Sequence, residues 1–351
     1  MAQFPTDPAI GWPEVAVLPV TYLCNANCDM CALGDLNQRD RLSDDELAAI
    51  FGHPSVADTL RAINFTGGEP TLRKDLAHLV ARLVDSCPNL ESFSLNSNGM
   101  LRTSFARIRE VIDVACTRGK KLYLFISLDG VGDMHDEIRG VPGAYARTVA
   151  TIDAIRALRV PRTNLGFGVS ATATVKNINH LDDVLRFAVE RDLSVSFTFP
   201  METDVYMNNS DRVARFRADA ELVERFIAFL DTLADHTDRI SPPMSFYRSL
   251  QDTLRGRRRV APCIFQRGGF FLEPNGDVRP CWRSSELLFG SLAEQSFAEI
   301  WSGPRRREIV ETIEERFCQT CPSPCYVGFP SPLLEPPPAR ALLPLAVKGP
   351  A

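Results

Sequence analysis

Short apolar runs rich in β-forming residues alternate with amphipathic segments along most of this chain. The predicted strands are 15–22, 62–66, 92–97, 122–128, 165–172 and 194–199. The helical patterns lie near 44–52, 75–86, 104–118, 144–158, 180–191 and 210–236. Six successive βα units require parallel strands with right-handed crossovers, so we expect an open or closed α/β barrel.

Polar motifs follow the first four predicted strands. They are the cysteines Cys24, Cys28 and Cys31, the segment Gly67, Gly68, Glu69 and Pro70, the pair Asn96 and Asn98, and the pair Ser127 and Asp129. Active sites of α/β barrels gather at the carboxyl ends of the strands. We therefore expect these four loops to converge on one site.

The cysteine triplet supplies three thiolates within eight residues, at a C-x3-C-x2-C spacing. One loop could therefore hold a metal cluster, and the absence of a fourth cysteine nearby leaves one coordination position open. A zinc ion completed by a distant ligand is the alternative. Structural zinc sites usually have paired C-x2-C knuckles and four protein ligands, which disfavours zinc here.

These motifs resemble those of the radical S-adenosylmethionine (radical SAM) superfamily. The resemblance implies a partial (β/α)6 barrel in which the three cysteines hold a [4Fe-4S] cluster and S-adenosylmethionine chelates the open iron. It also implies that the backbone of 67–70 approaches the methionyl amine and that Glu69 helps to hold it. The further cofactor contacts implied are Asn96, Asn98, Ser127, Asp129 and Arg139, the last beside the cofactor carboxylate.

One position departs from the family pattern. Many members have an aromatic residue just before the third cysteine, near the adenine, where this sequence has Met30. A polarizable thioether can still pack against the edge of an aromatic ring. We therefore keep Met30 among the expected cofactor contacts.

A second group of cysteines lies after residue 240. Cys263 and Cys281 bracket the turn 274–277 and its flanking apolar residues, which predicts a β-hairpin that brings both thiolates to one end. A predicted helix over 297–316 leads to Cys318 and Cys321. Four thiolates can complete the shell of a zinc ion or of an iron–sulfur cluster.

The pattern C-x12-G-x4-C, a helix and C-x2-C resembles the SPASM or twitch extension of radical SAM enzymes, which binds auxiliary [4Fe-4S] clusters. No cysteine follows Cys325, so the shorter twitch form with one auxiliary cluster fits better. Cys325 is then a surplus thiol: an exchangeable ligand, a hydrogen-atom donor to the substrate, or a spare cysteine. Cys87 and Cys116 are weaker candidates for the donor role.

Composition and the termini exclude several classes of protein. The chain has 351 residues and a net charge of −5, which gives no reason to expect nucleic-acid binding. The predicted parts are an extension over 1–14, the barrel over 15–240, an iron–sulfur domain over 241–329 and a proline-rich tail over 330–351. The first 14 residues lack a basic start and a continuous apolar segment, so we expect a cytoplasmic protein with no membrane partner.

The resemblance implies reductive cleavage of S-adenosylmethionine, fed by a flavodoxin- or ferredoxin-type electron donor. The resulting 5'-deoxyadenosyl radical would remove hydrogen from a small polar intermediate of the sugar, aminocyclitol or nucleoside type, giving oxidation or epimerisation. The alternatives are maturation of a ribosomally made peptide and a non-catalytic iron–sulfur or zinc protein. Candidate substrate contacts are Glu202, Asp204, Tyr206 and Asn208, with Arg248 and the cluster 255–259 available for a phosphate or carboxylate.

Overall fold

The computed structural model describes residues 13–33, 42–161, 163–203, 205, 207, 209–261, 263–266, 268–323 and 325, and of Arg212 only the backbone. Asp204, Tyr206, Asn208, the proline-rich tail and most of the N-terminal extension lie outside the described residues. The strands are β1 (Val15–Pro19), β2 (Ala62–Thr66), β3 (Ser92–Ser97), β4 (Lys121–Ser127), β5 (Leu165–Thr172), β6 (Ser194–Thr198), β7 (Gly269–Leu272), β8 (Asp277–Arg279) and β9 (Gly290–Ser291).

Helices connect and follow these strands. They are α1 (Asp44–Phe51), α2 (Pro54–Ala57), α3 (Leu76–Ser86), α4 (Ser104–Thr117), α5 (Asp133–Arg139), α6 (Ala144–Arg156), α7 (Leu181–Glu190), α8 (Ser210–Ala218), α9 (Ala220–Thr232), α10 (Met244–Leu254), α11 (Phe297–Ser302) and α12 (Pro304–Ile313). Short turns of other helix types are η2 (Pro70–Leu72), η3 (Leu233–His236), η4 (Ile264–Gln266) and η5 (Glu314–Cys318).

One sheet joins the two parts of the chain. Its strand order is β6-β5-β4-β3-β2-β1-β7-β8-β9. Strands β1 to β6 are parallel, as the βα repeat predicts. β1 also pairs in parallel with β7, which starts an antiparallel meander through β8 and β9. The predicted α/β barrel is confirmed, and the predicted hairpin over 269–279 extends the same sheet.

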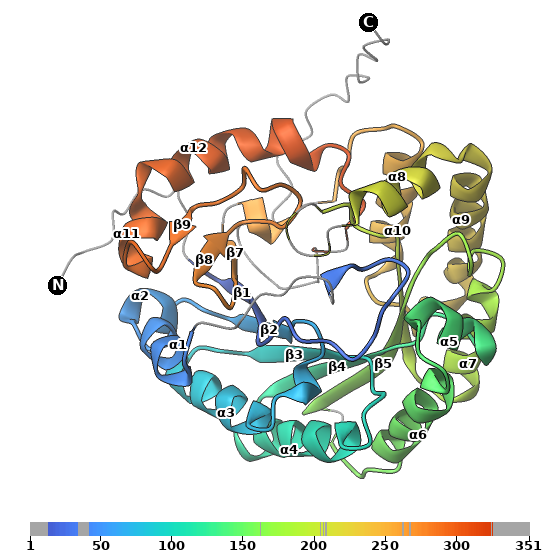
Figure 1. The fold of residues 1–351 in the computed structure, drawn as a ribbon, viewed down its shortest axis with the longest axis horizontal. Coiled ribbons are helices and arrows are strands. Elements are labelled where there is room, and N and C mark those ends of the chain that lie inside the picture. The colour runs from blue at the N-terminus through green and yellow to red at the C-terminus, as the bar shows by residue number, and fades with distance from the viewer. Residues whose placement is uncertain are drawn as a thin grey trace, which may run out of the picture.

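The two faces of the parallel strands differ in chemistry. The outer face is mostly buried and apolar, with Leu165 and Phe167 of β5 half-buried, and Figure 1 shows α3, α4 and α6 along that side of the sheet. Phe65 and Phe93 of this face meet edge to face at 6.0 Å. The opposite, inner face carries Tyr123 and Phe125 of β4, and beside them half-buried residues with neutral polar side chains: Asn64, Ser94, Asn96, Ser127, Ser170 and Ser196. We call this set the inner polar face.

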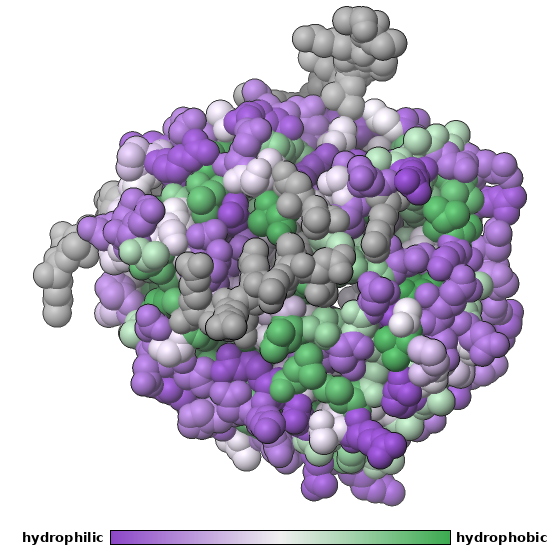
Figure 2. All heavy atoms as spheres, viewed as in Figure 1, coloured by the Kyte–Doolittle hydropathy of each residue, from purple (hydrophilic) through white to green (hydrophobic). Residues whose placement is uncertain are grey.

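Hydrophilic and hydrophobic side chains are distributed unevenly over the surface. Figure 2 shows mostly hydrophilic side chains around the rim of the molecule, with hydrophobic patches below the middle of the face in view and near its right-hand edge. Leu23, Val131 and Val175 are exposed hydrophobic residues on the loops after β1, β4 and β5. Within the described residues, no helix has the length and apolar character needed to cross a membrane.

Two predicted helices are broken in the structure. The helix predicted over 210–236 divides at Asp219, whose side chain accepts hydrogen bonds from the backbone of Glu221 and Leu222 and so begins α9. The helix predicted over 297–316 divides at Gly303, because Pro304 has no backbone N–H and occupies the first turn of α12. The predicted capping box of Ser43 and Glu46 is present at α1.

Helix α5 was not predicted, and His135 fixes its position beside the ends of the strands. The imidazole is fully buried, and its Nδ1 accepts a hydrogen bond from the backbone N–H of Asp129 at 3.1 Å. Burial, followed by the charge of the nearby Arg139, lowers the pKa of His135 to about 4. The ring is therefore neutral in the folded protein at neutral pH.

We predict that His135 makes the fold sensitive to acid. An unfolded histidine takes up a proton near pH 6.5, whereas folded His135 resists protonation down to about pH 4. Below pH 6.5 the unfolded chain therefore binds a proton at this histidine and the folded chain does not. The free energy of unfolding is highest above pH 6.5 and falls as the pH drops toward 4. Between pH 7.5 and pH 5 this loss is about 2 kcal/mol of unfolding free energy.

Urea unfolding at the two pH values tests this prediction. His135→Asn, whose side-chain oxygen can accept the same backbone hydrogen bond, should lose less stability on acidification than the wild type. His78→Asn, at an exposed position of α3, is the matched control and should respond as the wild type does. Equal acid sensitivity of His135→Asn and the wild type would contradict the prediction.

Candidate metal centres

The loop that carries Cys24, Cys28 and Cys31 follows β1 and is held by the end of α5. The backbone N–H groups of Asn27 and Asp29 donate to the carbonyl oxygens of Arg139 and Ile138 at 3.0 and 2.9 Å. Gly140, which ends α5 with φ of +63°, lies so close that a Cβ atom there would stand 2.4 Å from the carbonyl oxygen of Asn27. Only glycine combines this conformation with this contact.

The glycines after β2 support the same loop from its other side. The N–H of Gly68 donates to the carbonyl oxygen of Thr21, and that of Glu69 donates to the carbonyl oxygen of Leu23, both at 2.8 Å. A Cβ atom on Gly68 would lie 2.1 Å from the carbonyl oxygen of Leu23. Gly67 and Gly68 therefore allow direct backbone contact with the cysteine loop, a role that the sequence did not indicate.

Glu69 fastens the loops after β2 and β3 to each other. Its buried carboxylate accepts hydrogen bonds from the backbone N–H of Thr71, the hydroxyl of Ser97 and the backbone N–H of Asn98, at 3.0, 2.7 and 2.7 Å. The Asn98 amide in turn donates to Asn25 Oδ1 at 2.8 Å. The predicted convergence of 67–70 and Asn98 on the cysteine loop is thus present, and Pro70 begins η2.

Arg139 lies against a cysteine of the loop. Its Nη2 is 2.5 Å from Asp129 Oδ2, and its Nη1 donates to Cys28 Sγ at 3.6 Å. Burial alone would lower the pKa of Arg139, but the charges of Asp129 and Cys28 raise it. Asp129 Oδ1 also accepts the backbone N–H of Thr172 at 2.8 Å. The contact of Arg139 with a cofactor carboxylate stays a prediction.

Burial raises the pKa of Cys24 and Cys28 in this loop. The pKa of Cys24 rises to about 11, first because of burial and then because of Cys28 and Glu69. Burial also raises the pKa of Cys28, while Arg139 opposes that rise. A buried thiolate without a positive partner is costly, so three thiols in one loop suit a metal whose charge compensates theirs.

A cavity lies beside the cysteine loop at the carboxyl ends of β5 and β6. It is lined by Met30, Thr172, Thr198, Phe199, Pro200, Met201, Met207 and Asn209. The Asn209 amide donates to the carbonyl oxygen of Met30 at 2.8 Å, and Ala32 N–H donates to the carbonyl oxygen of Met207 at 2.8 Å. Of the lining residues only Met30 was a predicted contact. Thr172 and Thr198 end β5 and β6, and the others come from the loop after β6.

The remaining predicted residues around this site lie on the sheet, in an ion pair or on the surface. Asn96 and Ser127 belong to the inner polar face, and the Asn96 amide donates to Asn64 Oδ1 at 3.4 Å. Glu202 forms an ion pair with Arg217 at 3.5 Å, so its carboxylate is already partnered. Arg248 and Arg255 to Arg258 are exposed, and of the cluster 255–259 only Arg259 reaches the second cysteine group.

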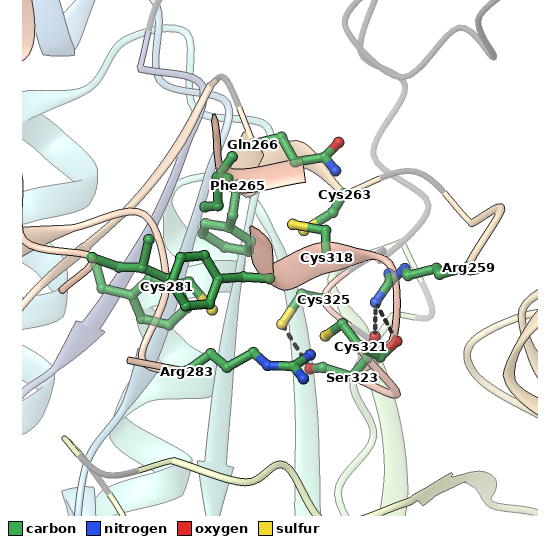
Figure 3. Close-up of a pocket in the computed structure, with 14 residues that line it drawn as sticks. Arg259, Cys263, Phe265, Gln266, Cys281, Arg283, Cys318, Cys321, Ser323 and Cys325 are labelled. Carbon is green, nitrogen blue, oxygen red and sulfur yellow. Dashed lines mark hydrogen bonds between the residues drawn. The ribbon is translucent and has the colours of Figure 1, made fainter. Parts of the chain in front are cut away.

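The second cysteine group lines a single pocket. Cys263, Cys281, Cys318, Cys321 and Cys325 all contribute to its wall, together with Arg259, Arg283, Phe265, Phe271 and Ser323 (Figure 3). The predicted meeting of the hairpin and the C-x2-C knuckle is confirmed. Burial raises the pKa of Cys318 to about 11 and also raises those of Cys263 and Cys281, with neighbouring thiolates adding to the effect.

Cys325 lies among the four predicted ligands. Its Sγ is 2.9 Å from Ser323 Oγ, and burial followed by the charge of Cys321 raises its pKa. The pocket therefore holds one thiol more than a four-ligand shell requires. Cys87 packs in the main core and Cys116 is exposed on α4, so neither lies at this pocket.

Two guanidinium groups line the same pocket with hydrogen-bonding capacity to spare. Arg259 donates to the carbonyl oxygens of Cys321 and Ser323 at 3.2 and 2.8 Å, and Arg283 donates to Thr320 Oγ1 at 3.0 Å. Arg259 Nη2 and Arg283 Nη1 are buried, and neither has a hydrogen-bond partner among the described residues. Burial alone would lower the pKa of Arg259, but the charges of Cys321 and Cys263 raise it.

The spacing of the thiols separates a cluster from a single ion. A tetrahedral zinc ion, with Zn–S bonds of about 2.3 Å, needs its four sulfurs roughly 4 Å apart. No group of three or more His, Cys, Asp or Glu side chains in the described part of the chain is compact enough to hold one metal ion. A cubane places four irons between its ligands, so five thiols and two unpaired N–H donors around one pocket fit an iron–sulfur cluster better.

Comparisons with known proteins agree with both sites. The family model described as radical SAM superfamily matches residues 18–188. The model named SPASM and described as an iron-sulfur cluster-binding domain matches residues 263–322. The first match contains Cys24, Cys28 and Cys31, and the second contains Cys263 to Cys321 but ends before Cys325.

Curated relatives cover much of the chain. It is 25% identical to a pre-heme d1 synthase of Dinoroseobacter shibae over 330 residues, which are 86% of this chain and 76% of the relative. It is 26% identical to an AdoMet-dependent heme synthase of Methanosarcina barkeri over 82% of both proteins. It is 30% identical to a GTP 3',8-cyclase of Pseudomonas putida over 66% of both, somewhat less than two thirds of that relative's length.

The fold also occurs among solved structures. The structure titled native anSMEcpe with bound AdoMet superposes with a TM-score of 0.61 at 18% identity, over 85% of this chain and 83% of that one. The two family matches imply a [4Fe-4S] cluster, S-adenosylmethionine and auxiliary iron–sulfur chemistry as the cofactors. The chain therefore belongs to the radical SAM superfamily and carries a C-terminal SPASM iron–sulfur domain.

Proposed function

We propose that this enzyme removes a hydrogen atom from a carbon of a small, uncharged, polar substrate and completes a two-electron oxidation. When bound, the cluster and S-adenosylmethionine supply the 5'-deoxyadenosyl radical that takes the hydrogen atom. The chain's own residues position these groups, bind the substrate and keep water away. The inner polar face of the sheet is the observation that carries the proposal.

A parallel sheet is usually covered on both faces and apolar on both. In this chain the inner polar face places amides and hydroxyls on neighbouring strands, with Ser127 opposite Ser170 and Ser170 opposite Ser196. These side chains are half-buried and carry no charge. Such a surface matches a ligand with several hydroxyl or amide groups, because each buried polar group needs a hydrogen-bond partner.

The cavity beside Met30 supports a place for the adenosine of the cofactor. It lies between the cysteine loop and the ends of β5 and β6, and three thioethers and Phe199 offer a largely apolar surface for a purine. The hydroxyls of Thr172 and Thr198, 3.2 Å apart, add polar contacts. Cys24, Cys28 and Cys31 would hold the adjacent cluster, with Arg139 beside Cys28.

The position of the auxiliary pocket favours oxidation over epimerisation. Cys31, Cys325, Met201 and Met207 all pack against one small hydrophobic cluster, so the two cysteine groups approach the same region of the molecule. A cluster there could accept the electron that a substrate radical gives up. Epimerisation would instead need a lone hydrogen-atom donor, and Cys325, the candidate for that role, lies among four other thiols.

We predict that anaerobic reconstitution loads about eight irons per chain, because two four-iron clusters are expected. Changing Cys24, Cys28 and Cys31 to alanine should leave about four irons and abolish formation of 5'-deoxyadenosine. Iron analysis and chromatography of the reaction measure both quantities. About four irons together with one zinc in the wild type would disprove the auxiliary cluster, and activity in the triple variant would disprove the radical mechanism.

Cys325→Ala separates the roles of the fifth thiol. Loss of auxiliary-cluster iron would make Cys325 a ligand. Full iron content with 5'-deoxyadenosine still formed but product lost would make it a hydrogen-atom donor, and would turn the proposal from oxidation to epimerisation. The exposed Cys116→Ala is the matched control and should change neither quantity.

The substrate class can be tested by isotope transfer. We predict that small polar metabolites, extracted from cells grown on a deuterated carbon source, transfer deuterium into 5'-deoxyadenosine, which gains one mass unit. The peptide fraction of the same extract should not. Transfer from the peptide fraction would assign the enzyme to peptide maturation instead.

The inner polar face provides the variant for this test. Ser170→Ala with Ser196→Ala should weaken substrate binding by about 1 kcal/mol for each lost hydrogen bond, roughly 30-fold in total. Deuterium transfer at low substrate should fall accordingly, while cofactor cleavage without substrate is unchanged. Ser86→Ala on α3, outside this face, is the control.

A further inference from the structure

We propose that Arg259 and Arg283 bind the auxiliary cluster directly and raise its reduction potential. Each arginine would donate its unpartnered N–H to a sulfur of the cluster or of a ligating cysteine. The proposal concerns the auxiliary cluster alone and does not depend on the identity of the substrate.

The arrangement of the two side chains is the first line of evidence. In Figure 3 the guanidinium groups approach the turn that carries Cys321, Ser323 and Cys325 from opposite sides. Arg259 comes from the segment after α10, and Arg283 comes from the segment after β8. Both line the five-cysteine pocket, although they are 24 positions apart in the sequence.

The second line of evidence is the pair of N–H groups that the hydrogen bonds of Arg259 and Arg283 leave unused. Arg259 Nη2 and Arg283 Nη1 are buried without a partner among the described residues. A buried guanidinium N–H that finds no acceptor costs free energy, and most such groups in folded proteins are paired. Cluster sulfurs and cysteine thiolates are acceptors, so a cluster in this pocket would satisfy both groups.

The third line of evidence is charge. Among the described residues, the acceptors that Arg259 and Arg283 use are neutral: the carbonyl oxygens of Ala261, Cys321 and Ser323 and the hydroxyl of Thr320. A four-iron cluster with four thiolates is an anion, and one-electron reduction adds one more negative charge without moving a proton. Two cations at the sulfurs stabilise the reduced form more than the oxidised form, which raises the potential.

Arg139 at the first cysteine loop gives a contrast within the same chain. It also approaches a cysteine sulfur, but Asp129 neutralises it at 2.5 Å. The first site therefore gains a hydrogen bond without much net positive charge. The two arginines of the auxiliary pocket would make that cluster the easier of the two to reduce, as an electron acceptor requires.

The test uses the full chain with Cys24, Cys28 and Cys31 changed to alanine, so that iron loads only the auxiliary site. Dithionite titration followed by electron paramagnetic resonance gives the midpoint potential. Arg259→Gln and Arg283→Gln should each lower it, and the double variant should lower it further. Arg259→Lys, which keeps the charge, should lower it less. Arg258→Gln, an exposed neighbour paired with Glu314, is the control and should leave it unchanged.

Iron content and the stability of the iron-free chain separate binding from a purely structural role. Urea unfolding of the iron-free variants measures what the lost hydrogen bonds of Arg259 to carbonyl oxygens and of Arg283 to Thr320 cost without a cluster. If Arg259→Gln fails to load iron, the potentials of Arg259→Lys and Arg283→Gln decide. Full iron content with an unaltered potential in both glutamine variants would refute the proposal. It would also be refuted if the variants lost iron only because the iron-free protein had become less stable. Because no substrate is used, this outcome is independent of the proposed oxidation.

Discussion

Backbone contacts around the cysteine loop are the constraint on which the candidate active site depends. The loop from Cys24 to Cys31 contains no helix or strand and cannot hold three thiols in place alone. Gly68 supports it from β2 and Gly140 supports it from α5, each at a distance that a Cβ atom would prevent. Glu69 then ties the supporting loop to the end of β3. The site is thus built from main-chain contacts between successive βα units.

Electrostatics distinguishes the two cysteine groups. Both are buried, and burial raises the pKa of thiols in each, so both favour a metal that replaces the protons. At the first group a carboxylate accompanies the arginine, whereas at the second the contacts of Arg259 and Arg283 are neutral. The same residue type therefore provides orientation at one site and net charge at the other. Such outer contacts determine the behaviour of a metal site as much as its ligands do.

Local patterns in the sequence were sufficient for the parts of the fold that local forces decide. The strands at 62–66, 92–97 and 165–172 match the predicted ranges, because their apolar outer residues and polar inner residues alternate. The breaks at Asp219 and Gly303 were missed because hydrophobic periodicity continues across them. Arg259 could not be separated from its exposed neighbours, since only tertiary packing turns it toward the cysteines. Met207 and Asn209 were missed for the same reason.

The shared strand β1 has a consequence for the two cysteine groups together. Its residues Val15 and Val17 pair with β2 on one side and with β7 on the other, so the C-terminal unit continues the sheet of the barrel without a linker between them. Backbone hydrogen bonds leave no hinge about which the two parts could rotate. An electron tunnelling between the two centres would therefore cross a path of constant length throughout turnover.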